Sequence, residues 1–310
     1  MENLNAVKKR IKSIESIGQM TGAMQLVSAA KRRRSEVLRS SMYPFFAHCA
    51  DSMRDIRRNT EKIDNPFFEL EQKTEGQTWK IAYFVLSGDQ GLAGAYNNNI
   101  VKDCEGHVQK KILENKNKGI ATEYKMYVFG RLAREKLIHL GYNVDETFSF
   151  PISEPTFFQA QKVVSIIKQK FLIEGFDLVY LVYTHMESAL NMSPEILRLA
   201  PVDLKSIDEV LKDYVDADDL KEGAQIEYYP NVNEVFSFFI DTYMTAMVYG
   251  AMTDAYASEQ TARYQAMDNA TNSAEDMLKS LELELNRARQ SKITNELTEI
   301  INGANQVDNL

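Results

Sequence analysis

The pattern of apolar and polar positions predicts a long helix at each end of the chain. From Asn3 to about Asn59, apolar residues recur every three or four positions, which indicates a helix. These apolar positions are Leu4, Val7, Ile11, Ile14, Ile17, Met20, Met24 and Val27. The last stretch, Asn231–Leu310, has no proline, and its only glycines are Gly250 and Gly303. A single helix there would be roughly 110 Å long. Such a helix needs an equally long partner, and the N-terminal stretch is the only candidate.

Small residues dominate the stripe that recurs along the C-terminal stretch. The stripe consists of Met247, Ala251, Ala255, Ser258, Ala262, Ala266, Asn269, Ser273, Met277 and Leu281. Small side chains let a second helix approach closely, whereas a free dimeric zipper favours large apolar residues at its seam. The stripe therefore predicts an intramolecular antiparallel pair with the N-terminal helix. The step from Ala288 to Ile293 shifts the register, so the handedness of the coiled coil stays open.

Helix-breaking residues interrupt the N-terminal helix. Gly18 and Gly22 each cost about 1 kcal/mol relative to alanine, which predicts either a closely passing backbone or a soft turn. Pro44 is expected to kink the helix or to divide it. The helical pattern fails between Ile63 and Thr78, where proline and glycine indicate a linker.

Between the two helical stretches, strand patterns alternate with helix patterns. The expected strands are Lys80–Ser87, Tyr124–Phe129, Val144–Phe150, Asp177–Thr184 and Ile196–Val202. The expected helices are Asn97–Asn115, Arg131–Leu140 and Thr156–Leu172, with Gly141 ending the second of them. This alternation predicts a mostly parallel sheet covered on both faces. The fold class is therefore α/β, with a long antiparallel coiled coil of N- and C-terminal helices and a central Rossmann-like α/β domain.

The same pattern gives expected domain boundaries. The N-terminal coiled-coil helix takes residues 1–60, the α/β domain takes 77–228, and the C-terminal helix takes 231–310. The acidic segment Asp203–Glu227 is expected to be a surface helix or loop. Pro230 is expected to open the C-terminal helix, because its missing N–H is tolerated in the first turn.

Composition and charge describe a soluble protein that meets partners. The chain is 44% apolar and 26% charged, with a net charge of −8. Residues 1–60 hold 12 Lys and Arg against 5 Asp and Glu, whereas residues 201–230 hold 3 against 9. Uneven charge of this kind often marks contact surfaces. Cys49 and Cys104 lack a metal-like spacing and indicate reduced thiols. The most apolar window, Phe236–Met252, is too short for a membrane span, and no signal peptide is expected.

A glycine-rich turn is the one segment that suggests enzyme chemistry. Gly88, Gly91 and Gly94 follow a strand and precede a helix, where a phosphate loop would lie. Their spacing fits neither the dinucleotide fingerprint nor the P-loop. After the next strand comes Gly130-Arg131-Leu132, where a dinucleotide site usually places an acid. The turn favours a structural role, and a nucleotide-dependent α/β enzyme with oligomerisation helices remains the alternative.

Histidines and basic residues give weaker signals. The histidines, His48, His107, His139 and His185, show no spacing suited to metal. His185 follows the strongest strand but has no obvious nucleophile nearby. The basic run Lys31–Arg34 is either a solvated helix face or a docking site for acidic partner loops. It would also suit a nucleic-acid binder, which the net charge of −8 disfavours. We expect no cofactor and no metal.

Three segments resemble one family. Ala257–Ala304 is similar to the C-terminal signature of the γ subunit of F-type ATP synthases, most distinctively in the run NRARQSKITNELTEI from Asn286 to Ile300. Arg10–Ser35 resembles the other end of the same family. The run LSGDQGLAGAYNNNI is similar to its first strand and turn. The matching segments lie in the same order along the chain.

The resemblance implies a central rotor shaft. Its coiled coil would lie inside the α3β3 hexamer, and its α/β domain would contact the ε subunit and the ring of c subunits. The chain would have no catalytic site, and it would couple proton translocation to ATP synthesis or hydrolysis. The resemblance implies no nucleic-acid partner and no direct membrane insertion. The implied location is peripheral, on the cytoplasmic side of the cell (inner) membrane.

The resemblance also implies particular contact residues. Met24 matches the position that faces the acidic catch of β. The shaft-to-stator contact is matched by Arg263, Arg289, Gln290 and Thr294. Arginine beside acidic loops is physically reasonable, because charge-assisted pairs are strong. Tyr228 and Tyr229 match the foot near the c ring, although Tyr229 stands where an acid is expected. Gly18 and Gly22 replace basic or polar residues, which implies a softer shaft or altered torque contacts there. The regulatory cysteine insert of the chloroplast form is missing, which implies no thiol regulation.

Overall fold

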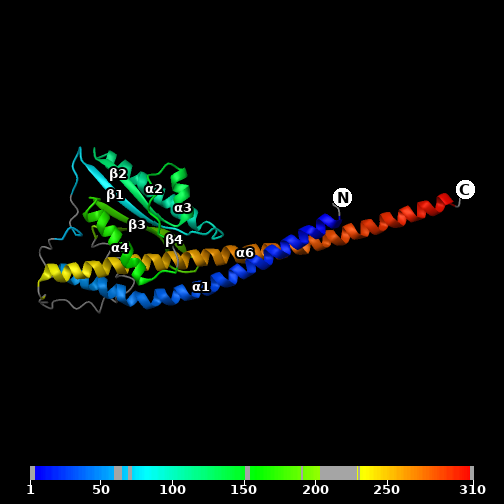
Figure 1. The fold of residues 1–310 in the computed structure, drawn as a ribbon, viewed down its shortest axis with the longest axis horizontal. Coiled ribbons are helices and arrows are strands. Elements are labelled where there is room, and N and C mark those ends of the chain that lie inside the picture. The colour runs from blue at the N-terminus through cyan, green and yellow to red at the C-terminus, as the bar shows by residue number, and fades with distance from the viewer. Residues whose placement is uncertain are drawn as a thin grey trace. The chain divides into compact units, whose positions relative to one another are not determined.

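Along the chain, one long helix precedes the α/β domain and a second long helix follows it. The computed structural model describes residues 4–58, 65–68, 72–150, 154–189, 191–202, 229 and 231–307. Helix α1 (Leu4–Arg58) comes first and α6 (Val232–Val307) last (Figure 1), as predicted. The chain forms two compact units, one from residues 1–29 and 263–310 and the other from residues 30–262. Helix α1 continues through Pro44. The expected division there is wrong, because proline removes one hydrogen bond from a helix of 55 residues.

A four-stranded sheet lies at the centre of the second unit, in the order β2-β1-β3-β4 (Figure 1). The strands are β1 (Thr78–Leu86), β2 (Ala121–Phe129), β3 (Leu178–Met186) and β4 (Met192–Ala200). Strand β1 is parallel to both β2 and β3, and β4 is antiparallel to β3. The mostly parallel sheet is therefore confirmed, and four of the five expected strands are present.

The expected strand Val144–Phe150 is wrong. Val144 makes only an isolated bridge to Met126. The next residue, Asp145, accepts hydrogen bonds from the backbone N–H groups of Thr147 and Phe148 at 2.9 and 3.0 Å. This local turn takes up the backbone donors that a strand would offer to its neighbour.

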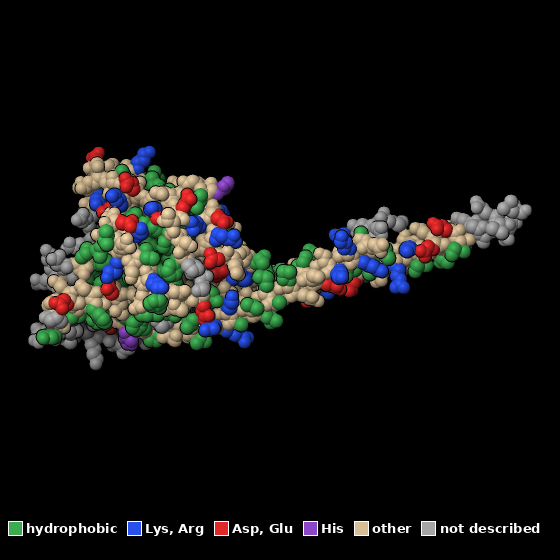
Figure 2. All heavy atoms as spheres, viewed as in Figure 1, with side chains coloured by type: hydrophobic (Ala, Val, Ile, Leu, Met, Phe, Trp, Pro, Cys, Tyr) green, Lys and Arg blue, Asp and Glu red, His purple; other side chains and the backbone are tan. Residues whose placement is uncertain are grey.

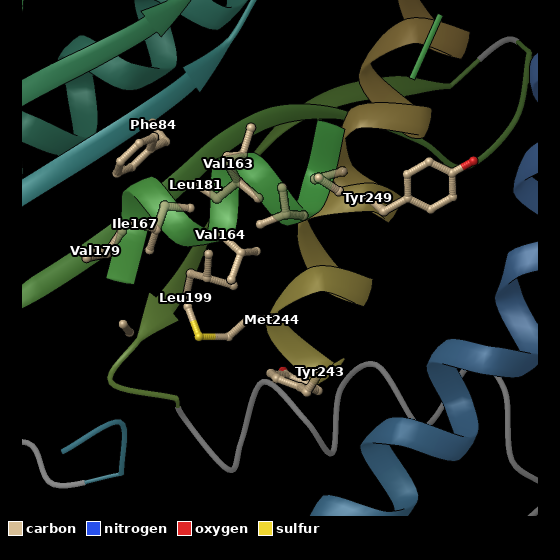
Figure 3. Close-up of a cluster of buried hydrophobic side chains, with 14 of the residues drawn as sticks. Phe84, Val163, Val164, Ile167, Val179, Leu181, Leu199, Tyr243, Met244 and Tyr249 are labelled. Carbon is tan, nitrogen blue, oxygen red and sulfur yellow. The ribbon is translucent and has the colours of Figure 1, made fainter. Parts of the chain in front are cut away.

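Helices cover both faces of the sheet, as the alternating pattern predicts. Helices α2 (Tyr96–Lys116) and α3 (Arg131–His139) pack on one face, around Ile100, Cys104 and Leu137. Helix α4 (Phe157–Leu172) and the first part of α6 pack on the other face. In Figure 3, Val164 of α4 and Met244 of α6 lie on either side of Leu199 of β4, in the same cluster. Thr156 caps α4 through a capping box, and Gly141, with φ of 82°, follows α3.

The first part of α6 is a core helix of the α/β domain. Phe236, Ile240, Met244, Val248 and Ala251 are all buried in the cluster on its face of the sheet. Helix α6 is long and apolar enough to cross a membrane by length and composition alone, with a mean hydropathy of 1.2 in its most apolar window. However, 56% of that window is buried inside the protein. Core packing therefore accounts for its apolar character.

Some expectations concern the segments around the domain. Of the predicted linker, residues 65–68 and 72–77 are described. Phe67 is buried there, and its ring lies 5.0 Å from that of Phe171, so this part of the linker is anchored in the core. The acidic segment Asp203–Glu227, together with Tyr228 and Pro230, lies outside the described residues. Near the start of α6, the Asn231 side chain accepts a hydrogen bond from the backbone N–H of Glu234 at 2.9 Å.

Candidate partner surface on the terminal helices

In the first unit, α1 and α6 form an antiparallel pair. The Gln25 amide donates to the Asp268 carboxylate at 2.6 Å. The Thr271 hydroxyl donates to that of Thr21 at 2.8 Å. A Cβ placed on Gly18 would lie 3.5 Å from the Cβ of Ala274. As the residue number rises on one helix it falls on the other, so the predicted antiparallel pairing is confirmed.

The seam of this pair follows a strict heptad period. On α1 the seam positions are Leu4, Val7, Ile11, Ile14, Gly18, Thr21, Gln25 and Ser28, all buried or half-buried. On α6 they are Met267, Thr271, Ala274, Leu278, Leu281, Leu285 and Ala288, again all buried or half-buried. Steps of three and four alternate throughout. A repeat of 3.5 residues produces a left-handed supercoil, which resolves the handedness that the sequence left open.

The predicted small-residue stripe is wrong as a description of this seam. Asn269, Ser273 and Met277 are exposed. Nearer the start of α6, Ala251 and Ala255 belong to the core of the α/β domain. Small residues occur on several faces of α6, so their spacing alone does not identify the face that contacts α1. Apolar spacing identified part of the seam, namely Leu4, Val7, Ile11, Ile14 and Leu281, but it missed the rest because Thr21, Gln25 and Thr271 are polar.

An apolar strip lies on α1 outside the seam. Ile17, Met20 and Val27 are exposed, with Met20 retaining 64% of its accessible surface. Leu26 is exposed beside them, and Met24 is half-buried. Singly exposed apolar residues are ordinary, but a contiguous strip is typical of a surface that meets a partner.

The distal end of α6 extends past the described start of α1. The register places Leu4 opposite Ala288, and α6 continues to Val307. Four large apolar residues of this end are exposed: Ile293, Leu297, Ile300 and Ile301. In Figure 2, hydrophobic and charged side chains are interspersed along this end of the helix. An amphipathic helix with its apolar face exposed is typical of a segment that packs against another protein.

The residues suggested by the resemblance lie in different environments. Arg289, Gln290 and Thr294 are exposed on the distal end of α6, and the Thr294 hydroxyl donates to the Gln290 carbonyl at 2.9 Å. Arg263 differs, because it retains only 5% of its accessible surface. The resemblance implied a contact with the stator, which would need an exposed side chain, but Arg263 is buried. Tyr229 is 93% exposed.

Acidic side chains lie beside the glycine-rich turn. Asp89 accepts a hydrogen bond from the backbone N–H of Arg131 at 2.9 Å, which places its carboxylate at the start of α3. A Cβ on Gly88 would lie 2.8 Å from Oε1 of Glu259, so a second carboxylate lies against the turn. Carboxylates beside the turn repel an anionic phosphate. This arrangement favours the structural role of the turn over nucleotide binding.

The other candidate residues are held in structural contacts. His185 Nδ1 lies 2.7 Å from the Asp254 carboxylate. In the basic run, Arg34 pairs with Glu154 at 2.5 Å and Arg32 lies 3.7 Å from Glu36. Burial raises the pKa of the Cys104 thiol to about 12, with Glu105 adding to the effect. Within the described part of the chain, no three His, Cys, Asp or Glu side chains gather as a metal site.

Two long helices and an α/β domain, with exposed apolar residues at the distal end of α6, are typical of a protein that binds partners. A family model described as ATP synthase matches residues 3–307. The chain is 37% identical over 305 residues to the ATP synthase gamma chain of Acetivibrio thermocellus, in an alignment that covers 98% of this chain and 99% of that one. It is 31% identical over 312 residues to the sodium ion specific ATP synthase gamma chain of Acetobacterium woodii, with 98% of each covered. The chain therefore belongs to the ATP synthase γ-chain family.

Solved structures share the fold. A chain of the Euglena gracilis mitochondrial ATP synthase, in rotational state 3, aligns with a TM-score of 0.61 at 16% identity. The alignment covers 98% of this chain and 94% of that one. A chain of the central stalk and c-ring of the Tetrahymena thermophila enzyme aligns with a TM-score of 0.53 at 21% identity, covering 81% and 99%. These structures confirm the predicted combination of long terminal helices and an α/β domain.

Proposed function

We propose that this chain is the central rotor shaft of an F-type ATP synthase. It couples proton translocation through the membrane sector to ATP synthesis or hydrolysis in the α3β3 hexamer, and it has no catalytic site of its own. Membership of the γ-chain family supports this role. The structural observation that carries it is the distal end of α6, which leaves Leu297 and Ile300 exposed beyond the described start of α1. Burial of about 100 Å² of apolar surface contributes roughly 2.5 kcal/mol, so these residues favour a partner that encloses the helix end.

The proposed contacts with the stator are Met24, Arg289, Gln290 and Thr294, which meet the α and β subunits. Arg289 is an exposed cation that suits an acidic loop. Arg263 matches the same contact set by resemblance, but its burial makes a direct stator contact unfavourable in this conformation.

The α/β domain is proposed to meet the ε subunit and the c ring. The foot contact consists of Tyr228 and Tyr229, of which Tyr229 is almost fully exposed. These proposed contacts imply a peripheral component on the cytoplasmic side of the cell membrane. The functional division is the N-terminal helix 1–60, the α/β domain 77–228 and the C-terminal helix 231–310.

The test uses the chain assembled with its own α, β, ε and membrane subunits in sealed vesicles. Arg289→Ala and Gln290→Ala are each expected to reduce coupled ATPase activity. The unfolding temperature of the free chain should not change, because both side chains are exposed. Lys279→Ala is the matched control, since Lys279 is another exposed cation of the same helix and pairs there with Asp276.

The outcome distinguishes an error in the proposed rotor function from an error in the assigned contact residues. If the wild-type chain fails to assemble with α and β, the rotor function is wrong. If it assembles and both variants retain full coupled activity, Arg289 and Gln290 leave the contact set. Because one relative is named sodium ion specific, ion uptake is followed for both protons and sodium.

A further inference from the structure

One segment of α6 is buried on all sides although it is rich in polar residues. Every residue of Asp254–Thr261 is buried, and five of these eight residues are polar. A helix that is enclosed on all sides is normally apolar. Buried polar side chains persist where they have partners, because an unsatisfied one costs free energy. The polar side chains of this segment are therefore expected to have specific partners in the surrounding domain.

Strand β3 supplies partners at its carboxyl end. His185 Nδ1 lies 2.7 Å from Oδ2 of Asp254. One turn further along α6, the Ser258 hydroxyl donates to the Thr184 carbonyl at 3.2 Å. Two consecutive residues of β3 thus hold two consecutive turns of α6.

The turn after β1 and the start of α2 supply contacts from another direction. The Tyr96 hydroxyl donates to the backbone carbonyl of Ala255 at 3.0 Å. The Glu259 carboxylate lies so close to Gly88 that a Cβ there would be 2.8 Å from Oε1 and 2.9 Å from Cδ. With about 100° per residue, positions 254, 255, 258 and 259 span about 140° of the helix circumference. The contacts therefore lie on more than one side of α6.

We propose that these contacts form a rotational lock, which prevents α6 from turning about its own axis within the α/β domain. The lock consists of Asp254, Ala255, Ser258 and Glu259 on α6 together with Gly88, Tyr96, Thr184 and His185. Because α6 is one continuous helix to Val307, the lock transmits torque between the α/β domain and the distal helix. This inference rests on the proposed rotor function.

Directional contacts suit this task better than apolar packing. Apolar burial depends on area and has no preferred direction of its own, so it fixes the angle of a helix only through the shapes of the packed side chains. A hydrogen bond weakens steeply as its distance and angle depart from the optimum. Rotation by one residue would also separate the buried carboxylate of Asp254 from His185, which is costly.

The experiment compares ATP hydrolysis with ATP-driven ion uptake in vesicles that contain the complete complex. Asp254→Asn keeps the size of the side chain but removes its charge, and Gly88→Ala forces a methyl group against Glu259. We expect the number of ions taken up per ATP hydrolysed to fall at least two-fold at a high opposing ion gradient, with the hydrolysis rate little changed. Thr253→Ala is the matched control. Thr253 is also buried, but its hydroxyl donates to Tyr249 within the same helix at 2.8 Å.

Each outcome decides between the rotor function and the lock. If the wild-type chain does not support coupled uptake with its partners, the rotor function itself fails. If the wild type and both variants show the same uptake per ATP at every gradient, the lock is overturned. Failure of Asp254→Asn to assemble would also overturn it, because the contact would then be a requirement for folding. Loss of uptake in Thr253→Ala as well would show a general effect of buried polar groups and contradict the lock.

Discussion

Gly22 lies in α1 at a position where glycine has no structural requirement. Its backbone is helical, and its φ is not positive. A Cβ placed on Gly22 would meet no atom within 4 Å outside its immediate helical surroundings. Neither a tight turn nor a close contact therefore explains the glycine. Replacement by alanine should strengthen the helix without displacing a neighbour.

The expected gain follows from helix propensity. Glycine in a helix interior is about 1 kcal/mol less favourable than alanine. Part of this difference arises in the unfolded chain, where glycine has more conformational freedom. Because about 1.4 kcal/mol corresponds to a factor of ten, a gain of about 1 kcal/mol should reduce local opening about five-fold.

Hydrogen exchange on the full chain measures this gain. In Gly22→Ala, the amides of residues 15–28 should exchange about five-fold more slowly wherever local opening controls exchange. Gly106→Ala is the matched control, because Gly106 lies in α2 and a methyl group added there would also meet open space. That variant should slow exchange in α2 and leave α1 unchanged.

Faster exchange in Gly22→Ala would refute this reasoning. It would mean that the added methyl collides with a neighbour or that α1 is not regularly helical at this point. Unchanged exchange in both glycine variants would show that propensity does not control opening in these helices. A selective gain in α1 would support the interpretation of Gly22 as a soft point of the shaft.

Three further predictions concern the α/β domain. Gly130→Ala should destabilise the chain by more than about 3 kcal/mol in thermal unfolding, because φ is +83° and the new Cβ would lie 2.3 Å from the Ser87 carbonyl oxygen. For Asp145, burial raises the pKa, but hydrogen bonds from Thr147 and a nearby lysine more than reverse this and lower it from 3.8 to about 2. The resulting stabilisation of about 2 kcal/mol is present above about pH 4 and disappears as the pH falls toward about 2. In urea unfolding, Asp145→Asn should therefore lower the free energy of unfolding at about pH 7 but not near pH 2. Burial lowers the pKa of His107 from 6.5 to about 4. As the pH decreases, the unfolded chain therefore binds this proton first, and the free energy of unfolding falls between about pH 6.5 and 4. His107→Gln should make this decrease shallower in the same urea assay.

Much of the fold could be predicted from the chain because local signals agreed with one another. The apolar run of β1 is a buried parallel strand, and the three- and four-residue spacing of α1 is a helix. Thr156 and Gly141 lie at helix ends, where their side-chain or backbone properties are favourable. The absence of proline after Pro230 was enough to predict an uninterrupted helix.

The candidate site was less accessible to sequence reasoning. The resemblance to a family supplied Arg289, Gln290 and Thr294, and the structure exposes all three. It also supplied Arg263, which is buried. Burial of an arginine depends on what packs around it, which residue type and spacing do not reveal.

By itself, the sequence determined the helices, the order of the strands and helices along the chain, and the family. These follow from local periodicity, backbone preferences and a distinctive run of residues. Only the tertiary structure decided which face of each helix is buried. Small residues occur on several faces of α6, so the heptad seam became visible only through pairs such as Gln25 with Asp268. The contacts of Asp254 and Glu259 were likewise decided by folding, because their partners lie far away along the chain.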